Sequence, residues 1–175
     1  MTEQNGAGVE KAAITTEHIL SGLEERYPLP RWVTVRELPN ATAWKAARRI
    51  DLFAIGAWPS EGFDTVAFEV KVSRADFLRD MKDPTKQRFS RLMASNFYFA
   101  TVAGIVKPGE LPDWAGLVEF DPADEDPYRR RAGKFVVPAP ELPRMHPTWP
   151  FVACLTRLMA QRASKATLAT GGTDA

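Results

Sequence analysis

Three charged residues lie inside two stretches of sequence that otherwise have the composition of buried strands. The first, residues 50–58, is apolar on both faces of a strand except at Asp51. In the second, residues 65–72, side chains alternate so that Glu69 and Lys71 share one face and valine and phenylalanine occupy the other. Isolated charges in a core are costly to desolvate, so the fold must give these three partners or a bound ion.

The short, turn-forming segment at residues 59–62 predicts that these two strands form an antiparallel hairpin. Helices inserted within a run of strands indicate an α/β fold with a central mixed sheet flanked by helices. Residues 38–45 and 121–134 are expected to be loops. The other predicted elements are a helix with an apolar stripe over 14–23, strands over 32–35, 96–102, 117–120 and 135–137, helices capped by Ser73 and Asp83, and a last helix after His146-Pro147.

The 175 residues suit a single domain, expected over 13–162, with disordered ends at 1–12 and 163–175. The formal net charge is +1, so any attraction to nucleic acid must come from a local patch. One cysteine excludes an internal disulfide, and two histidines disfavour a histidine-built metal site. Without a signal-like or membrane-spanning run, a cytoplasmic protein with no membrane contact is expected.

The charge pattern itself points to a chemistry. Carboxylates that converge from adjacent strands, here Asp51 and Glu69, form a hard oxygen site suited to Mg²⁺ or Mn²⁺. A lysine beside such an ion, here Lys71, can orient the attacking water or neutralise charge on a phosphate. Together the three residues fit phosphodiester hydrolysis without any histidine.

At these residues the chain resembles a known family. Asp51 followed by Glu69-Val70-Lys71 resembles the D…(D/E)-X-K signature of the PD-(D/E)XK nuclease superfamily, although Ile50 stands where the signature has proline. The stretch 71–78, with 97–99 and 116–118, resembles the MmcB-like DNA-repair and phage-borne members more narrowly. The resemblance covers roughly residues 14–120 and implies a restriction-endonuclease-like core of αβββαβ order.

The resemblance also implies roles for individual residues. Asp51 and Glu69 would be metal ligands, the Val70 carbonyl a further ligand, and Lys71 the water-activating residue. The implied function is a Mg²⁺- or Mn²⁺-dependent deoxyribonuclease acting in DNA repair, recombination or phage DNA processing. The alternative is a catalytically silent DNA-binding or adaptor module on the same fold.

Further site residues are expected from the helices. The family often has an acidic residue on its first helix, for which Glu17, Glu24 and Glu25 are candidates, with Glu17 favoured because it lies nearest the helix start. A polar residue from the following helix, Lys86 or Gln87, matches another family position, and Gln87 is taken as the catalytic candidate.

Several residues after the E-X-K motif are candidates for contacting DNA. On a helix such charges are either a solvated face or a track for phosphates, and both interpretations stay open. A homodimer is also compatible with the resemblance, because many nucleases of this architecture act as dimers. The candidates are Ser73, Arg74, Arg79, Lys82, Lys86 and Arg91, and Arg88 belongs to the same group of charges.

Overall fold

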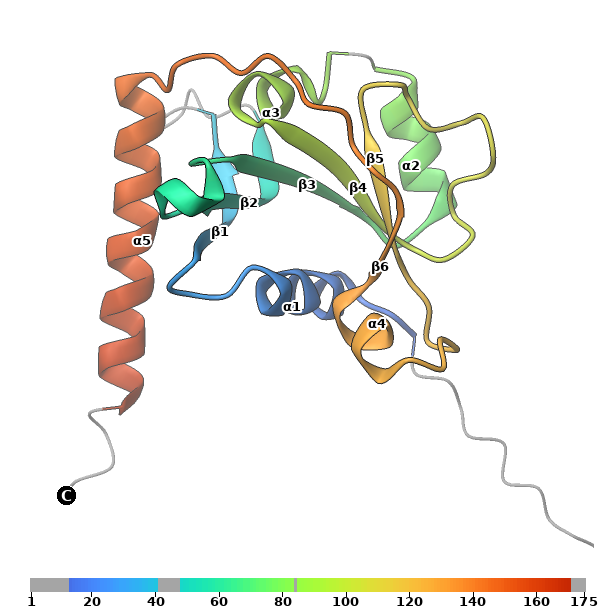
Figure 1. Cartoon of the computed structure of the whole chain (residues 1–175), viewed down its shortest axis with the longest axis horizontal. Helices are drawn as coiled ribbons and strands as arrows, with labels where there is room; N and C mark the ends of the chain where they lie inside the picture. Colours follow the sequence, from blue (N-terminus) through green and yellow to red (C-terminus); the bar gives the residue numbers. More distant parts are fainter. Residues whose placement is uncertain (1–12, 41–47, 84, 171–175) are drawn as a thin grey trace, which may run out of the picture.

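The apolar runs that hold Asp51 and Glu69 build the centre of one six-stranded sheet (Figure 1). The structure, a computed structural model, describes residues 13–40, 48–83 and 85–170. The strands are β1 (Trp32–Pro39), β2 (Arg49–Gly56), β3 (Thr65–Lys71), β4 (Asn96–Val102), β5 (Gly116–Phe120) and β6 (Lys134–Val137), and they lie side by side in that order. The helices are α1 (Thr16–Arg26), α2 (Arg74–Met81), α3 (Arg88–Met93), α4 (Pro127–Ala132) and α5 (Trp149–Thr170), with a 3-10 helix η2 (Pro59–Glu61).

The sheet is mixed, as predicted. β1 pairs antiparallel with β2, and β2 pairs antiparallel with β3. β4 and β5 run parallel to β3, and β6 pairs antiparallel with β5 at the edge of the sheet. The predicted hairpin of β2 and β3 is confirmed, with Leu52 paired to Phe68. Gly62 closes its turn with a φ of 63°, a backbone conformation that glycine adopts without strain. The parallel step from β3 to β4 is made through α2 and α3.

Helices cover both faces of the sheet, and each face has its own core (Figure 1). On one face, Leu52, Phe68 and Phe120 pack beneath α1. On the other, Phe53, Phe97 and Phe99 form the core with buried residues of α2 and α3. Because neighbouring residues of β3 point to opposite faces, Glu69 and Lys71 lie on the α2 and α3 side, while Phe68 lies on the α1 side.

The long helix α5 packs along β1, the first strand of the sheet (Figure 1). Its Arg162 donates a hydrogen bond of 3.2 Å to the carbonyl oxygen of Thr34, which satisfies one free carbonyl of the edge strand. The apolar face predicted for this helix is confirmed, since Phe151 and Cys154 are buried. Within the part of the chain that the structure describes, no helix is both long enough and apolar enough to cross a bilayer.

The ends of the chain differ from the expectation. Disorder was expected from residue 163, but α5 continues through Thr170. Residues 163–170 are rich in alanine and contain neither glycine nor proline, which favours continuation of a helix. Residues 1–12 and 171–175 lie outside the described residues, so the disorder expected there stays a prediction.

Other differences are local. The expected loop over 121–134 contains α4, because the Asp126 side chain accepts hydrogen bonds from the first backbone amides of that helix and Pro127 starts it. The loop expected from Leu38 is wrong at its beginning, since β1 runs to Pro39; residues 41–47 lie outside the described residues. The helix expected to begin at Asp83 begins at Arg88, after a turn in which Asp83 bonds Thr85.

Candidate active site

Asp51 lies where β2 and β3 separate. The assigned pairing of the two strands ends at Leu52 and Phe68, and in the same register the next pair would be Asp51 and Glu69. Instead of a backbone carbonyl, the Oδ2 atom of Asp51 accepts the hydrogen bond of the Val70 amide, at 2.8 Å. A charge-assisted bond of this kind fixes the carboxylate between the two strands.

Glu69 and Lys71 project side by side from β3 into the interior. Each residue is 8% exposed, and the Lys71 Nζ atom lies 2.6 Å from Oε1 of Glu69. The parallel pairing with β4 places Phe99 beside Glu69 and Thr101 beside Lys71. The two side chains therefore leave a central strand, where a rigid scaffold holds them, rather than a loop.

A third carboxylate, Asp80 of α2, completes the group. Asp80 is 3% exposed, and its Oδ2 atom lies 2.7 Å from the Lys71 Nζ atom. Lys86 donates to the other oxygen, and Gln87 Nε2 donates to Oδ2 at 3.3 Å. Lys71 is thus held between Glu69 and Asp80. We call the six residues of this group the ionic cluster: Asp51, Glu69, Lys71, Asp80, Lys86 and Gln87.

The ionic cluster carries more negative than positive charge. Three carboxylates face two ammonium groups, which leaves one formal negative charge uncompensated. Burial, together with the nearby charge of Asp51, raises the pKa of Glu69 to about 7. Burial likewise raises the pKa of Asp51, although the Val70 amide and Lys71 oppose that shift. Lys71 and Lys86 therefore do not fully stabilise the charged forms of Asp51 and Glu69.

Asp80 behaves differently from Glu69. Burial alone would raise the pKa of Asp80, but hydrogen bonds from Lys71 and Lys86 outweigh burial and lower that pKa. For Lys71, burial alone would lower the pKa, and the charges of Glu69 and Asp80 reverse that effect and raise it. Asp80 and Lys71 are therefore a charged pair, and the surplus negative charge belongs to Asp51 and Glu69.

The donors present suit a small divalent cation. Asp51 and Glu69 supply two hard carboxylate groups, and Mg²⁺ is commonly held by one or two carboxylates while it keeps several waters. No group of three or more His, Cys, Asp or Glu side chains arranged to hold a metal occurs within residues 13–40, 48–83 and 85–170.

The structure does not bring Glu17 to the ionic cluster. Its carboxylate pairs with Arg36 of β1 at 2.8 Å, and its side chain is 71% exposed. Glu17 belongs to α1, which packs on the opposite face of the sheet from Lys71. Glu24 also pairs with Arg36, and Glu25 with Arg131, so neither alternative on α1 contacts the cluster. Gln87, in contrast, is buried and reaches Asp80 directly.

Most of the residues expected to contact DNA already have protein partners. Arg74 bonds the Glu110 carboxylate at 2.6 Å, and Arg79 pairs with Asp76 of its own helix at 3.0 Å. Ser73 caps α2 by accepting the amide of Asp76. Lys86 is held by Asp80, whereas Lys82 is exposed at the end of α2. Arg91 stacks on the Trp114 ring with its guanidinium 4.2 Å from the ring centroid.

Two acidic residues near the site were not identified from the sequence. Asp80 lies three residues after the buried Phe77 on α2, and this spacing puts both residues on one face of the helix. A carboxylate on an otherwise apolar helix face is the sequence feature that could have identified Asp80. Leu78, the apolar residue that follows Phe77 on the same helix, is 37% exposed. Glu37 lies opposite Asp51 in the register of β1 and β2, and its charge raises the pKa of Asp51.

Glu37 also has an unusual backbone. Its φ is 52°, in the left-handed region that residues with side chains adopt at a cost. No motif marks such a residue in the sequence. Its carboxylate lies 3.4 Å from Arg49 and is exposed, so it adds negative potential beside Asp51 without entering the buried cluster.

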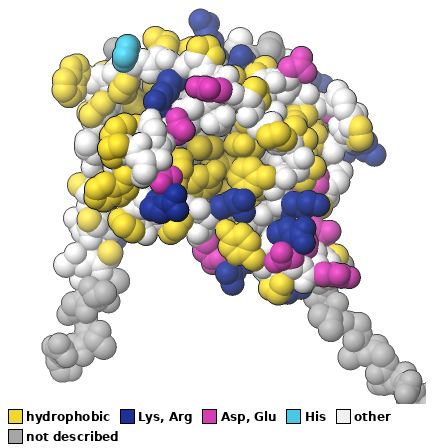
Figure 2. Space-filling view, viewed as in Figure 1, with side chains coloured by type: hydrophobic (Ala, Val, Ile, Leu, Met, Phe, Trp, Pro, Cys, Tyr) yellow, Lys and Arg dark blue, Asp and Glu magenta, His cyan; other side chains and the backbone are white. Residues whose placement is uncertain are grey.

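The face of the molecule drawn in Figure 2 carries no broad field of one sign. Figure 2 shows acidic and basic side chains interspersed over one face of the molecule, with apolar side chains at its centre. This distribution agrees with the formal net charge of +1. Any recognition of a charged ligand must therefore rest on particular side chains.

Comparison with known proteins supports the fold alone. No protein-family model matches the chain, and neither does any curated protein. Among solved structures, the chain is similar to the SPO1766 protein of unknown function from Silicibacter pomeroyi, with a TM-score of 0.54 and 20% sequence identity. The match covers 90% of this chain and 89% of that chain, so the likeness extends over nearly the whole α/β fold.

Proposed function

We propose that the chain is a Mg²⁺- or Mn²⁺-dependent nuclease that hydrolyses DNA phosphodiester bonds. The observation that carries this proposal is the surplus of negative charge at Asp51 and Glu69, beside the buried ammonium group of Lys71. A cation bound by the two carboxylates would relieve that surplus. The same cation would meet the oxygens of a phosphodiester, which carries the complementary negative charge.

The order of elements supports a restriction-endonuclease-like core. α1 precedes three antiparallel strands, two helices follow β3, and β4 then pairs parallel to β3. This is the αβββαβ order that the sequence resemblance implies. Asp51 and Glu69 lie on the two neighbouring strands β2 and β3, at positions that correspond to the signature.

Four residues of the ionic cluster, Asp51, Glu69, Lys71 and Asp80, have a task in this chemistry. Asp51 and Glu69 hold the cation, with the Val70 carbonyl as the proposed further ligand. When bound, the cation supplies a Lewis acid that polarises the phosphate and lowers the pKa of a bound water. Lys71, held by Asp80, orients the attacking water and neutralises charge that develops on the phosphate. Water adds across one P–O bond, and the products are a phosphate monoester end and a hydroxyl end.

A cleavage assay tests the proposal. The purified chain is incubated with single-stranded, duplex and branched DNA in Mn²⁺ or in EDTA. We expect cleavage in Mn²⁺ alone, with losses of at least about a hundredfold in Glu69→Gln and Lys71→Met. Glu119→Gln, a change on β5 outside the ionic cluster, is the matched control and should cleave like the unsubstituted chain. Cleavage that persists undiminished in Glu69→Gln or Lys71→Met contradicts the proposal.

A second candidate function is a catalytically silent DNA-binding or adaptor module. It is favoured by the way Asp80 pairs with both Lys71 and Lys86, because a buried network of this kind can be structural. This alternative predicts salt-sensitive DNA binding with no hydrolysis and little dependence on metal. Calorimetric titration separates the two functions, since a nuclease site binds Mn²⁺ and loses that binding in Asp51→Asn.

A further inference from the structure

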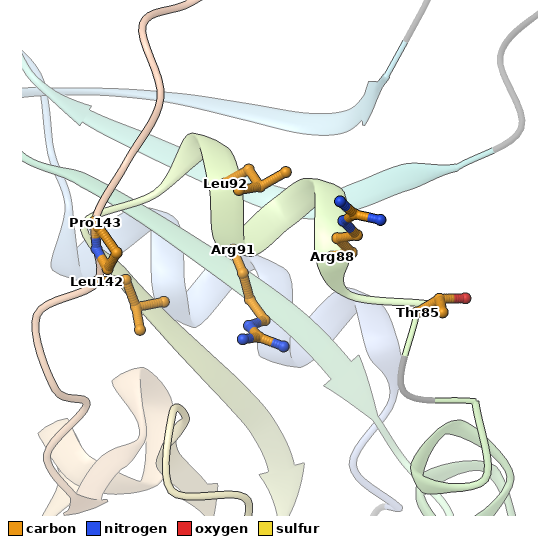
Figure 3. Close-up of a pocket in the computed structure, with 6 residues that line it drawn as sticks. All are labelled: Thr85, Arg88, Arg91, Leu92, Leu142 and Pro143. Carbon is orange, nitrogen blue, oxygen red and sulfur yellow. The ribbon is translucent and has the colours of Figure 1, made fainter.

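A surface pocket adjoins the turn that leads into α3. Its volume is about 290 Å³, and it is lined by two arginines, a threonine and three apolar residues. Figure 3 shows Arg88 and Arg91 projecting in different directions from successive turns of α3, with Leu142 and Pro143 of the segment after β6 on the side of Arg91. We call this the Arg88/Arg91 pocket; its lining residues are Thr85, Arg88, Arg91, Leu92, Leu142 and Pro143.

The two arginines of this pocket differ from most others in their pairing. Arg31, Arg36 and Arg74 each donate to a glutamate carboxylate. Within residues 13–40, 48–83 and 85–170, neither Arg88 nor Arg91 forms an ion pair with a carboxylate. Two cations that line one pocket without an acidic partner among the described residues make it a place where an anion gains charge complementarity.

The pocket is held in shape before any ligand arrives. Arg91 stacks on Trp114, which restricts its guanidinium, and its buried Nε atom has no hydrogen-bond acceptor among the described residues. The facing segment is fixed by two backbone bonds of 2.7 Å, from Leu142 to Ser95 and from Met145 to Leu92. A preformed pocket loses less entropy on binding than a pair of free arginine side chains would.

The pocket also adjoins the candidate active site. Its residues Thr85 and Arg88 flank Lys86 and Gln87, whose side chains reach Asp80 in the ionic cluster. Residues 85–88 therefore contribute alternately to the two sites: Thr85 and Arg88 line the pocket, and Lys86 and Gln87 contact Asp80. A polyanionic strand that meets the cluster with one phosphate has a second cationic contact within its reach.

We propose that the Arg88/Arg91 pocket binds a backbone phosphate of the nucleic-acid strand, next to the phosphate that is cleaved. The proposal rests on the proposed function for its substrate class and adds the residues that position the strand. Planar guanidinium groups match the oxygens of a phosphodiester. The strand would thus be held by Arg88 and Arg91, and not by Arg74 and Arg79, whose charges are paired.

Binding is tested without catalysis. Fluorescence anisotropy in EDTA follows a labelled 20-nucleotide single strand and the matching duplex over a range of salt concentrations. The variants are Arg88→Ala, at an exposed position, and Arg91→Gln, which keeps much of the packing on Trp114. Arg130→Ala, which removes the same charge from α4 on the opposite face, is the matched control. Thermal unfolding checks that each variant is folded, and Arg91→Lys replaces Arg91→Gln if the latter is not.

We expect Arg88→Ala and Arg91→Gln each to weaken binding roughly three- to tenfold at low salt. Each should reduce the slope of log affinity against log salt by about one unit, as the loss of one phosphate contact does. Arg130→Ala should change neither quantity. Binding and slopes equal to those of the unsubstituted chain in both pocket variants, or absence of binding in the unsubstituted chain, would overturn the proposal.

Competition with inorganic phosphate distinguishes a pocket that binds a phosphate of the nucleic-acid strand from one that binds free phosphate. If millimolar phosphate displaces the oligonucleotide completely and affinity does not rise with strand length, the pocket binds a free phosphate and the proposal is wrong. If affinity rises with length, the strand is the ligand. Because no metal is present, strand binding that depends on Arg88 stands even where the cleavage assay fails, so the two proposals fail separately.

Discussion

The two faces of the sheet place their charges in opposite ways. On the α1 face the core is apolar, and ion pairs such as Glu17 with Arg36 lie at its exposed rim. On the α2 and α3 face, Glu69, Lys71 and Asp80 are buried among the aromatic residues of the core. One strand, β3, supplies both environments through its alternating side chains. Exposed ion pairs contribute little to the free energy of unfolding, and an apolar core such as that of the α1 face is sufficient for folding. Burying the charges of Glu69, Lys71 and Asp80 carries a desolvation cost, so stability alone does not explain the ionic cluster.

The same contrast holds for two glutamates. The Arg74 guanidinium and the Lys107 amide lower the pKa of Glu110 to about 2, while burial and the charge of Asp51 raise the pKa of Glu69 to about 7. A carboxylate with a full set of donors is stabilised in its charged form, and Glu69 lacks that set. The described groups around Glu69 therefore stabilise its charged form less than the Arg74 guanidinium and the Lys107 amide stabilise that of Glu110.

The largest expected effect is on stability, from Asp80→Ala. This change removes the carboxylate that the buried ammonium group of Lys71 shares with the partly exposed Lys86, which should cost about 3 kcal/mol of unfolding free energy. Urea denaturation measures it. Asp76→Ala, on the same helix but with its carboxylate at the surface, should stay close to the unsubstituted chain. Equal losses in the two variants would remove the distinction between buried and exposed pairs.

The next effect concerns metal affinity, in Lys71→Met. Without the ammonium group 2.6 Å away, the Glu69 carboxylate is free for a cation. Mn²⁺ should therefore bind roughly three- to tenfold tighter while cleavage is lost. Isothermal calorimetry reports the affinity, and Lys82→Met, at an exposed position, is the control. Weaker Mn²⁺ binding in Lys71→Met would show that Lys71 builds the site instead of competing for it.

A smaller effect is the pH dependence of stability. Because the pKa of Glu69 is raised from its ordinary 4.5 to about 7, the folded chain binds a proton that the unfolded chain releases in this range. In EDTA, stability should therefore rise as pH falls from about 7 toward 4.5, and Glu69→Gln should lack this component. Saturating Mn²⁺ should abolish it as well. Unfolding midpoints compared across pH test the sign, and a component that grows with rising pH would refute it.

The smallest expected effect is that of Glu17→Gln. Its carboxylate is exposed and lies on the α1 side, so neither Mn²⁺ affinity nor the urea midpoint should change measurably. Calorimetry on Glu17→Gln beside Asp51→Asn makes the comparison directly. Loss of Mn²⁺ binding in both variants would mean that the two faces cooperate in one site.

The sequence predicted what depends on short-range periodicity. Glu69 and Lys71 are in contact because side chains alternate between the two faces of one strand. Asp51 contacts that strand because a short turn joins the two strands as a hairpin. The mixed sheet is predicted from the order of the elements, because helices interrupt the run of strands. None of these required knowledge of how a helix sits on the sheet.

What the sequence could not provide depends on helix orientation. Glu17 does not reach the cluster because α1 packs on the opposite face of the sheet. There Ile19, Leu20 and Leu23 are buried, and Glu17 pairs with Arg36. Asp80 enters the cluster because α2 buries the face that carries Phe77. The pattern of one helix fixes which side is apolar, but it does not fix which strand residue that side will meet.

We propose above that Asp51 and Glu69 hold a divalent cation. A crystal structure determined after soaking in Mn²⁺, with anomalous data, tests this binding. We expect a single strong anomalous peak between the two carboxylates, with Glu69 turned from Lys71 and Lys71 still bonded to Asp80. Absence of that peak at saturating Mn²⁺, with Glu69 still bonded to Lys71, would contradict it.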